Sequence, residues 1–144
     1  MTLYAAYGSN LDPRQMLQRA PHSPHLGTGW LRGWRLTCGG EEIGWEGAVA
    51  TLAEDLTSNV FVSIYDLTPS DEAALDEWEG VNTDLYRKLR VRVETLSATH
   101  TCYLYLLNSF EGGRPSARYL EIMINAAIEA GAPDDYIAEL RSWQ

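Results

Sequence analysis

The sequence predicts one domain of the α+β class, spanning residues 1–144, and two observations lead to this prediction. The chain has 144 residues, of which 45% are hydrophobic, and a chain of this size buries a core without needing a metal or a disulfide. Segments typical of β-strands fill its middle, whereas helical patterns occur at few and unevenly spaced places. Many strands with few, unevenly placed helices are typical of the α+β class.

The chain is expected to begin with a short apolar strand that stops at a tight turn over Gly8–Asn10, because Gly, Ser and Asn favour turns. Asp12 and Pro13 follow as a helix N-cap and first helical residue. A strand, a loop of small residues and a helix N-terminus together present several backbone N–H groups at one point. Such a point suits a carboxylate or an oxyanion.

The middle of the chain predicts a set of strands. Residue types that favour strands, bounded by Gly, Asn or Asp, occur over Trp30–Cys38, Gly47–Ala53 and Val60–Leu67. Apolar residues then alternate with polar ones from Leu89 to Glu94, which indicates a strand with one face in water. Thr101–Leu107 is apolar on both faces and is expected at the centre of the sheet. The least patterned segment before these strands is Ala20–Gly29.

Helices are predicted in two main places. Thr68, Pro69 and Asp71 supply an N-cap, a proline at the first helical position and an acid three residues after the cap. A second helix is expected from about Ser116 to Gly131, because apolar residues recur there at helical spacing. A short last helix is expected after Pro133.

Composition excludes several kinds of protein. The net charge of −9 argues against binding to nucleic acid, whose phosphates need a basic surface. The sequence contains no apolar run as long as a membrane span and no secretory signal at its N-terminus, so we expect a cytoplasmic protein. Cys38 and Cys102 both lie in apolar, strand-like sequence and are predicted to be buried free thiols.

Four segments, in order along the chain, carry a resemblance to a known family. They are Tyr7–Leu11, Gly47–Thr51, Leu75–Val81 with Tyr86 downstream, and Pro115–Tyr119 followed by Gly131–Tyr136. Together they resemble the gamma-glutamylcyclotransferase family over nearly the whole chain. The resemblance sharpens the expected fold to a small mixed β-barrel flanked by helices, and it implies an enzyme that uses no cofactor.

Glu79 is the candidate catalytic residue. In the helix that begins after Thr68, the stripe of Ala74, Leu75 and Trp78 is expected to face inward, with Glu79 beside it and Asp76 and Glu77 on the wet side. The helix dipole and partial burial against Trp78 would both raise the pKa of Glu79, which suits a group that accepts and donates protons. The alternative is an ordinary solvated glutamate at a helix end; the family resemblance favours the catalytic role.

The candidate substrate-binding residues lie mainly at the end of the first strand. They are Tyr4, Ala5, Ala6, Tyr7, Gly8, Ser9, Asn10, Tyr86 and Tyr119. Binding through the Gly8–Asn10 loop would use mostly backbone groups, and a tyrosine hydroxyl can donate to a substrate carboxylate. The alternatives are a plain turn and packed aromatic rings. The three histidines and two cysteines lack metal-site spacing, so no metal is expected.

The resemblance implies a γ-glutamyl substrate whose own α-amine attacks its γ-carbonyl, which yields 5-oxoproline and a free amine. Other possibilities are a cyclotransferase acting on a biosynthetic intermediate and a non-catalytic homologue that binds a small molecule. The pocket for the leaving group is expected from the loops Ala20–Gly29 and Ser109–Arg114, which carry no substrate signature. A homodimer is possible.

Overall fold

In the computed structural model, five strands close into a barrel in the order β1-β3-β2-β4-β5. The structure describes residues 2–39, 49–81, 86–107 and 114–144. The strands are β1 (Thr2–Ala6), β2 (His25–Gly39), β3 (Val49–Leu67), β4 (Tyr86–Glu94) and β5 (Thr99–Leu107). The helices are α1 (Pro13–Arg19), α2 (Pro69–Trp78), α3 (Ala117–Glu129) and α4 (Asp134–Arg141), with one 3-10 turn, η1 (Gly8–Leu11). This confirms the predicted small mixed barrel flanked by helices.

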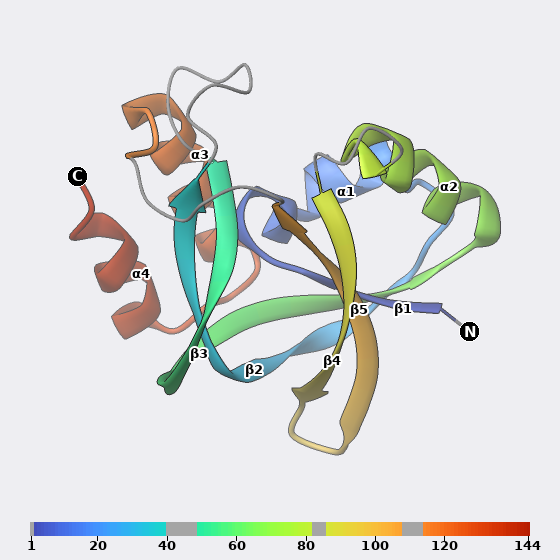
Figure 1. Ribbon diagram of the computed structural model, residues 1–144, viewed down its shortest axis with the longest axis horizontal. Coiled ribbons are helices and arrows are strands. Elements are labelled where there is room, and N and C mark those ends of the chain that lie inside the picture. The colour runs from blue at the N-terminus through green and yellow to red at the C-terminus, as the bar shows by residue number, and fades with distance from the viewer. Residues whose placement is uncertain (1, 40–48, 82–85, 108–113) are drawn as a thin grey trace.

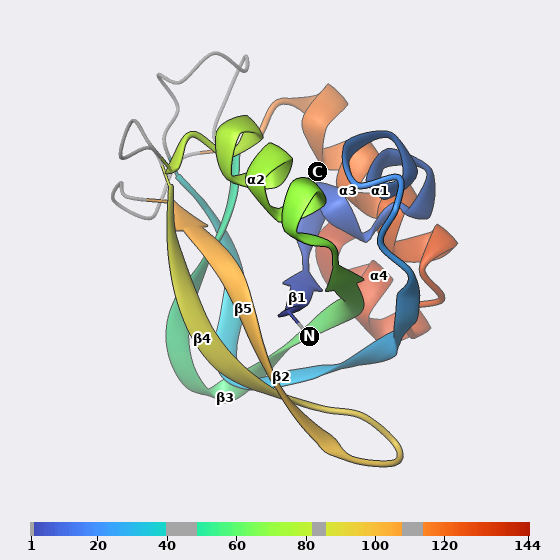
Figure 2. The same cartoon turned by 90° about the vertical axis from the view of Figure 1, so that its right-hand side faces the viewer.

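The helices form two groups around the barrel (Figure 1). Helices α3 and α4 lie together on one side, while α1 and α2 lie near one end on another side. In the view turned by 90°, α2 crosses above the strands (Figure 2). None of the helices in the described part of the chain is both long and apolar enough to span a membrane.

The barrel is held by three long antiparallel pairings and closed by two short ones. β1 and β5 are parallel and are paired at Tyr4 and Tyr103, whereas β2 and β4 are paired at Trp30 and Glu94. Gly29 is required at the second closure, because a Cβ on this residue would lie 2.6 Å from the backbone oxygen of Glu94. A side chain here would force the two strands apart.

The prediction that two separate strands lie in the middle of the chain is wrong. The segments Gly47–Ala53 and Val60–Leu67 were expected as separate strands, but their described residues belong to the single strand β3. The polar residues between them form a bulge, because Asp55 to Ser58 on β3 face only Gly33 on β2. The carboxylate of Asp55 accepts hydrogen bonds from the backbone and hydroxyl of Thr57 within this bulge. Polar residues that would end a strand therefore interrupt its register instead.

Strand β2 also begins earlier than expected, at His25, so half of the unpatterned segment Ala20–Gly29 is strand. The remainder is fixed to α2 through Asp71, a buried carboxylate in the first turn of that helix. Asp71 accepts hydrogen bonds from the backbone of His22 at 2.9 Å and from the hydroxyl of Ser23 at 2.7 Å. The Ser23 hydroxyl in turn accepts from the backbone N–H of Thr68 at 3.2 Å.

The helix starts are as predicted. Asp12, Thr68 and Ser116 each accept a hydrogen bond at their side chain from a backbone N–H of the following turn, which satisfies groups that a helix leaves unpaired at its beginning. The first helical residues after Asp12 and Thr68 are prolines, as expected.

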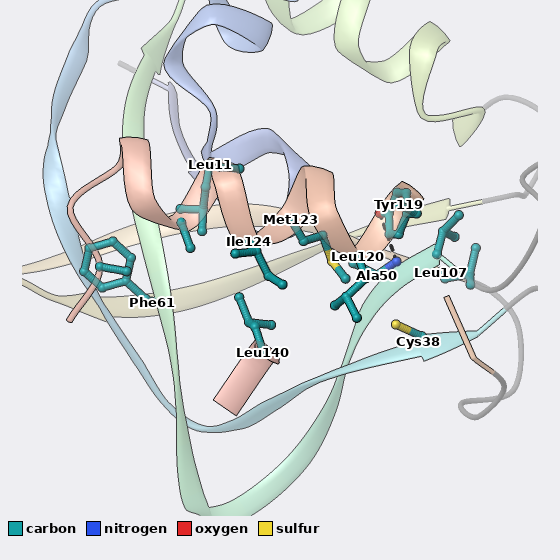
Figure 3. Packing of buried hydrophobic residues seen from close by; sticks show 14 residues of the cluster. Leu11, Cys38, Ala50, Phe61, Leu107, Tyr119, Leu120, Met123, Ile124 and Leu140 are labelled. Atoms are coloured by element: carbon teal, nitrogen blue, oxygen red, sulfur yellow. Dashed lines mark hydrogen bonds between the residues drawn. The ribbon is translucent and has the colours of Figure 1, made fainter. Parts of the chain in front are cut away.

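Helix α3 packs its apolar face against η1, β2, β3 and α4, and Figure 3 shows this cluster of buried side chains. Met123 and Ile124 lie at its centre, with Leu11 and Leu140 beside them. Fully burying an aliphatic side chain of this size contributes about 1.5–3 kcal/mol. The cluster therefore fixes α3 against η1, the turn that follows β1. Cys38 and Cys102 are buried free thiols, as predicted.

Candidate active site

A cavity of about 240 Å³ lies where β1, η1, α1 and the end of α2 meet. Its lining consists of Tyr4, Tyr7, Ser9, Asn10, Arg19, Val49, Ala50, Trp78, Glu79, Tyr86, Tyr105 and Tyr119. Six of the nine expected substrate-binding residues and the expected catalytic residue are in this set. A larger cleft of about 850 Å³ lies between β2, β3 and α4 and contains none of them. The side chains expected to bind the substrate or to transfer protons therefore line the smaller cavity.

The η1 turn carries Asn10 into this cavity. Gly8, at the start of the turn, has a φ of +63°, and a Cβ added there would lie 2.9 Å from the Cβ of Ala50. Glycine is therefore needed both for the backbone conformation and for the close approach of β3. The turn confirms the prediction of a tight turn over Gly8–Asn10 and takes the form of a single 3-10 turn.

Glu79 caps the C-terminal end of α2 and lies within hydrogen-bond distance of the turn. The amide nitrogen of Asn10 donates to Oε1 of Glu79 at 3.2 Å and to the hydroxyl of Tyr4 at 2.8 Å. The expected acid and the expected binding loop are thus close enough for one small ligand to contact both.

The pKa of the Glu79 carboxyl is raised, in the predicted direction. Burial is the main cause, because it penalises the charged form, and the Arg19 guanidinium and the Asn10 hydrogen bond oppose it. The pKa values of Tyr4, Tyr7 and Tyr86 are also raised, first by burial. These hydroxyls therefore stay neutral and keep a proton to donate at physiological pH.

The predicted environment of Glu79 was wrong in part. Leu75 is buried, but Ala74 is exposed and Trp78 is 63% exposed, so neither belongs to an inward stripe. Asp76, expected on the wet side, accepts a hydrogen bond from the hydroxyl of Tyr105 at 2.7 Å and pairs with Lys88 at 2.9 Å. Helix α2 lies at the end of the barrel, so Asp76, which a periodicity argument assigns to water, contacts Tyr105 from β5, whereas Glu77 is exposed as expected.

Tyr86 reaches the cavity from the start of β4 and Tyr119 from α3. Tyr119 lies in the first turn of α3, as predicted, and its hydroxyl accepts a hydrogen bond from the backbone N–H of Ala50 at 3.1 Å (Figure 3). Tyr7 donates to the backbone oxygen of Tyr105 at 2.5 Å. These bonds fix the rings that form the walls of the cavity.

Some expected residues lie elsewhere. Ala5 is fully buried in the barrel interior and Ala6 is fully buried between the barrel and helices α1 and α2, and neither they nor Gly8 line the cavity. No described residue of Ala20–Gly29 lines it either. Residues 109–113 of the other expected loop fall outside the described part of the chain, as do Gly47 and Ala48. Within the described ranges, no group of three His, Cys, Asp or Glu side chains is placed to hold a metal.

The sequence interpretation missed Arg19, Trp78 and Tyr105 as cavity residues. The Arg19 guanidinium donates a hydrogen bond to Oδ1 of Asn10 at 2.5 Å. The guanidinium carbon, Cζ, lies 4.4 Å from the centre of the Trp78 ring. A basic residue in the last turn of a short helix and an aromatic residue at apolar spacing both have common structural explanations. The closeness of Arg19 to the Gly8–Asn10 turn along the chain was the available signal.

Comparisons with known proteins give relatives over nearly the whole chain. The profile of the AIG2-like family matches residues 59–140. The chain is 30% identical to the gamma-glutamylcyclotransferase of Homo sapiens and 29% identical to that of Mus musculus, in both cases over 97% of this chain and 77% of the relative. A solved structure of a gamma-glutamyl cyclotransferase superposes with a TM-score of 0.91 at 29% identity, covering 98% of this chain and 86% of that one.

Proposed function

Since this chain belongs to the gamma-glutamylcyclotransferase family, we propose that it is an enzyme that converts the γ-glutamyl group of its substrate into 5-oxoproline and releases a free amine. The observation that carries the proposal is the position of Glu79. Its half-buried carboxyl lies in a small cavity beside the family's characteristic turn, with its pKa raised by burial.

The reaction closes a five-membered ring within one molecule. The α-amine nitrogen attacks the γ-carbonyl carbon and forms a new C–N bond, and the bond from that carbon to the leaving nitrogen then breaks. Because the attack is intramolecular, holding the chain of the γ-glutamyl group in a bent conformation supplies much of the rate. A cavity of about 240 Å³ with walls of hydrogen-bonded tyrosine rings suits this task.

Glu79 is assigned both proton transfers. Its carboxylate takes the proton that the α-amine loses, and the resulting carboxylic acid gives a proton to the leaving nitrogen. A single group performs both steps best when its pKa lies near the operating pH, and the burial of Glu79 moves its pKa in that direction. No oxidant, metal or covalent intermediate is needed to balance these steps.

The turn at Gly8–Asn10 is assigned the binding of the substrate's α-carboxylate or of the developing oxyanion. Backbone N–H groups at the start of a helical turn have no acceptor within the turn, so they are suited to negative oxygen atoms. Tyr86 and Tyr119 line the same cavity and are assigned to positioning the γ-glutamyl group through their hydroxyls and rings.

The test is the release of 5-oxoproline from a panel of γ-glutamyl compounds that carry amino acids, simple amines or larger biosynthetic amines as leaving groups. We expect product from at least one class, and the preferred class identifies the leaving group. A protein that binds 5-oxoproline in this cavity but forms no product from any member of the panel would instead be a non-catalytic binder.

A further inference from the structure

Arg19 contributes the one positive charge among the described residues that line the cavity. Its guanidinium is half-buried, bonded to Asn10 Oδ1 on one side and stacked on Trp78 on the other. Stacking over an aromatic face holds an arginine in place and shields it from water. The exposed Trp78 thereby has a function that core packing does not give it.

The donor and acceptor pattern fixes how the Asn10 amide is turned. A guanidinium has only donors, so Asn10 must present its oxygen to Arg19. Its NH₂ group then faces the other way, where it donates to Tyr4 and to Oε1 of Glu79. Gln15 also lies 3.0 Å from Asn10 Oδ1, but an amide can present either a donor or an acceptor and does not dictate this orientation.

We propose that Arg19 is a positioning residue that holds the Asn10 amide so that it donates to Glu79 Oε1, which leaves Oε2 for proton transfer. Without the guanidinium, the amide could turn and place its oxygen against the Glu79 carboxylate, which would repel it. This inference rests on the catalytic role proposed for Glu79, on which Arg19 acts through Asn10.

The arrangement also makes Arg19 the main charge acting on Glu79. The other titratable groups that line the cavity are tyrosines from β1, β4, β5 and α3, namely Tyr4, Tyr86, Tyr105 and Tyr119, with Tyr7 between β1 and η1. Burial raises the pKa of each of them. They remain neutral in the working range of pH. Removing the positive charge of Arg19 should therefore raise the pKa of Glu79.

The experiment measures kcat against pH for Arg19→Met, Arg19→Lys, Asn10→Ala and the double variant Arg19→Met/Asn10→Ala. We expect Arg19→Met to lower kcat by about tenfold or more and to move the acidic limb of the profile to higher pH. Arg19→Lys keeps the charge and should restore the position of the limb while recovering only part of kcat. Arg14→Met, on the exposed side of α1, is the control and should match wild type.

The double variant tests whether Arg19 acts through Asn10. If it does, Arg19→Met costs less in the Asn10→Ala background than in wild type. The inference is overturned if the two losses multiply, or if Arg19→Met lowers only thermal stability and leaves the limb in place. If Arg19→Met does not fold, Arg19→Gln replaces it, with the same expected shift of the limb. Activity retained by Glu79→Gln would instead overturn the proposed function itself.

Discussion

The side-chain amide of Asn10 donates a hydrogen bond to the carboxylate of Glu79, joining two residues that are 69 positions apart in the chain. One partner follows the first strand and the other ends α2, so the bond joins the family's N-terminal turn to its acidic segment.

Replacing Glu79 with Gln keeps the size of the side chain and one hydrogen-bonding oxygen but removes proton transfer. We expect the rate of 5-oxoproline release to fall by ~100-fold or more, with the fold unchanged. The measurement is kcat with circular dichroism as the check on folding. Glu77→Gln, on an exposed position of the same helix, should leave the rate unchanged. Near-full turnover by Glu79→Gln would refute the assigned mechanism.

Gly8→Val should abolish binding of 5-oxoproline. A valine at a φ of +63° is strained, and its Cβ would meet the Cβ of Ala50 at 2.9 Å, so we also expect a loss of stability of ~1–3 kcal/mol. Titration calorimetry measures the binding and thermal unfolding measures the stability.

Ser9→Ala is the matched variant for the same turn, because it removes a side chain and keeps the backbone donor. It should weaken binding much less than Gly8→Val does. Equal losses in the two variants would show that the Ser9 hydroxyl, rather than the backbone of the turn, holds the ligand.

The raised pKa of Glu79 predicts a particular dependence of stability on pH. A carboxyl whose pKa is higher in the folded state binds more protons there than in the unfolded chain. Its stabilising contribution is fully present below the ordinary pKa and is lost as the pH rises through the folded-state value. Wild type should therefore lose stability relative to Glu79→Gln as the pH rises above the ordinary pKa of a glutamate, about 4.3. Parallel curves of Tm against pH for the two proteins would contradict this.

Turnover should survive dialysis against a chelator, because the assigned steps use a carboxyl group, backbone N–H groups and tyrosines. The assay compares 5-oxoproline release before and after dialysis, with added Mg²⁺, Mn²⁺ or Zn²⁺ as separate arms. Activity that is lost on dialysis and restored by one of these ions would show that a step depends on metal.

The sequence predicted the helix starts of this fold correctly, because they depend on residues that are close together in the chain. Asp12, Thr68 and Ser116 cap helices in the structure because capping involves only neighbouring residues. The continuity of β3 was not predictable in the same way, because the Asp55–Ser58 bulge exists only through pairing with β2. A polar cluster of this kind has the same composition whether it ends a strand or bulges from one.

In the candidate site, too, residues marked by the local sequence were predicted, and residues whose roles depend on contacts between distant elements were not. Glu79 and the Gly8–Asn10 turn were identified because the family resemblance marks them in the sequence. Arg19 and Trp78 were missed because their roles arise from a stacked contact between two helices. Ala5 and Ala6 were included with their neighbours in the strand, but the Ala5 side chain packs in the barrel interior and the Ala6 side chain packs against α1 and α2.

The hydrogen bonds that Asp71 accepts from His22 and Ser23 have a consequence for how this enzyme tolerates sequence change. These hydrogen bonds connect the segment that follows Arg19 to α2, the helix that ends at Glu79. The positions of the Arg19 and Glu79 side chains in the cavity therefore depend on each other. Ser23 and Asp71 do not line the cavity, yet a substitution at either would misalign both charges together. Selection for turnover would then act on positions that never meet a ligand.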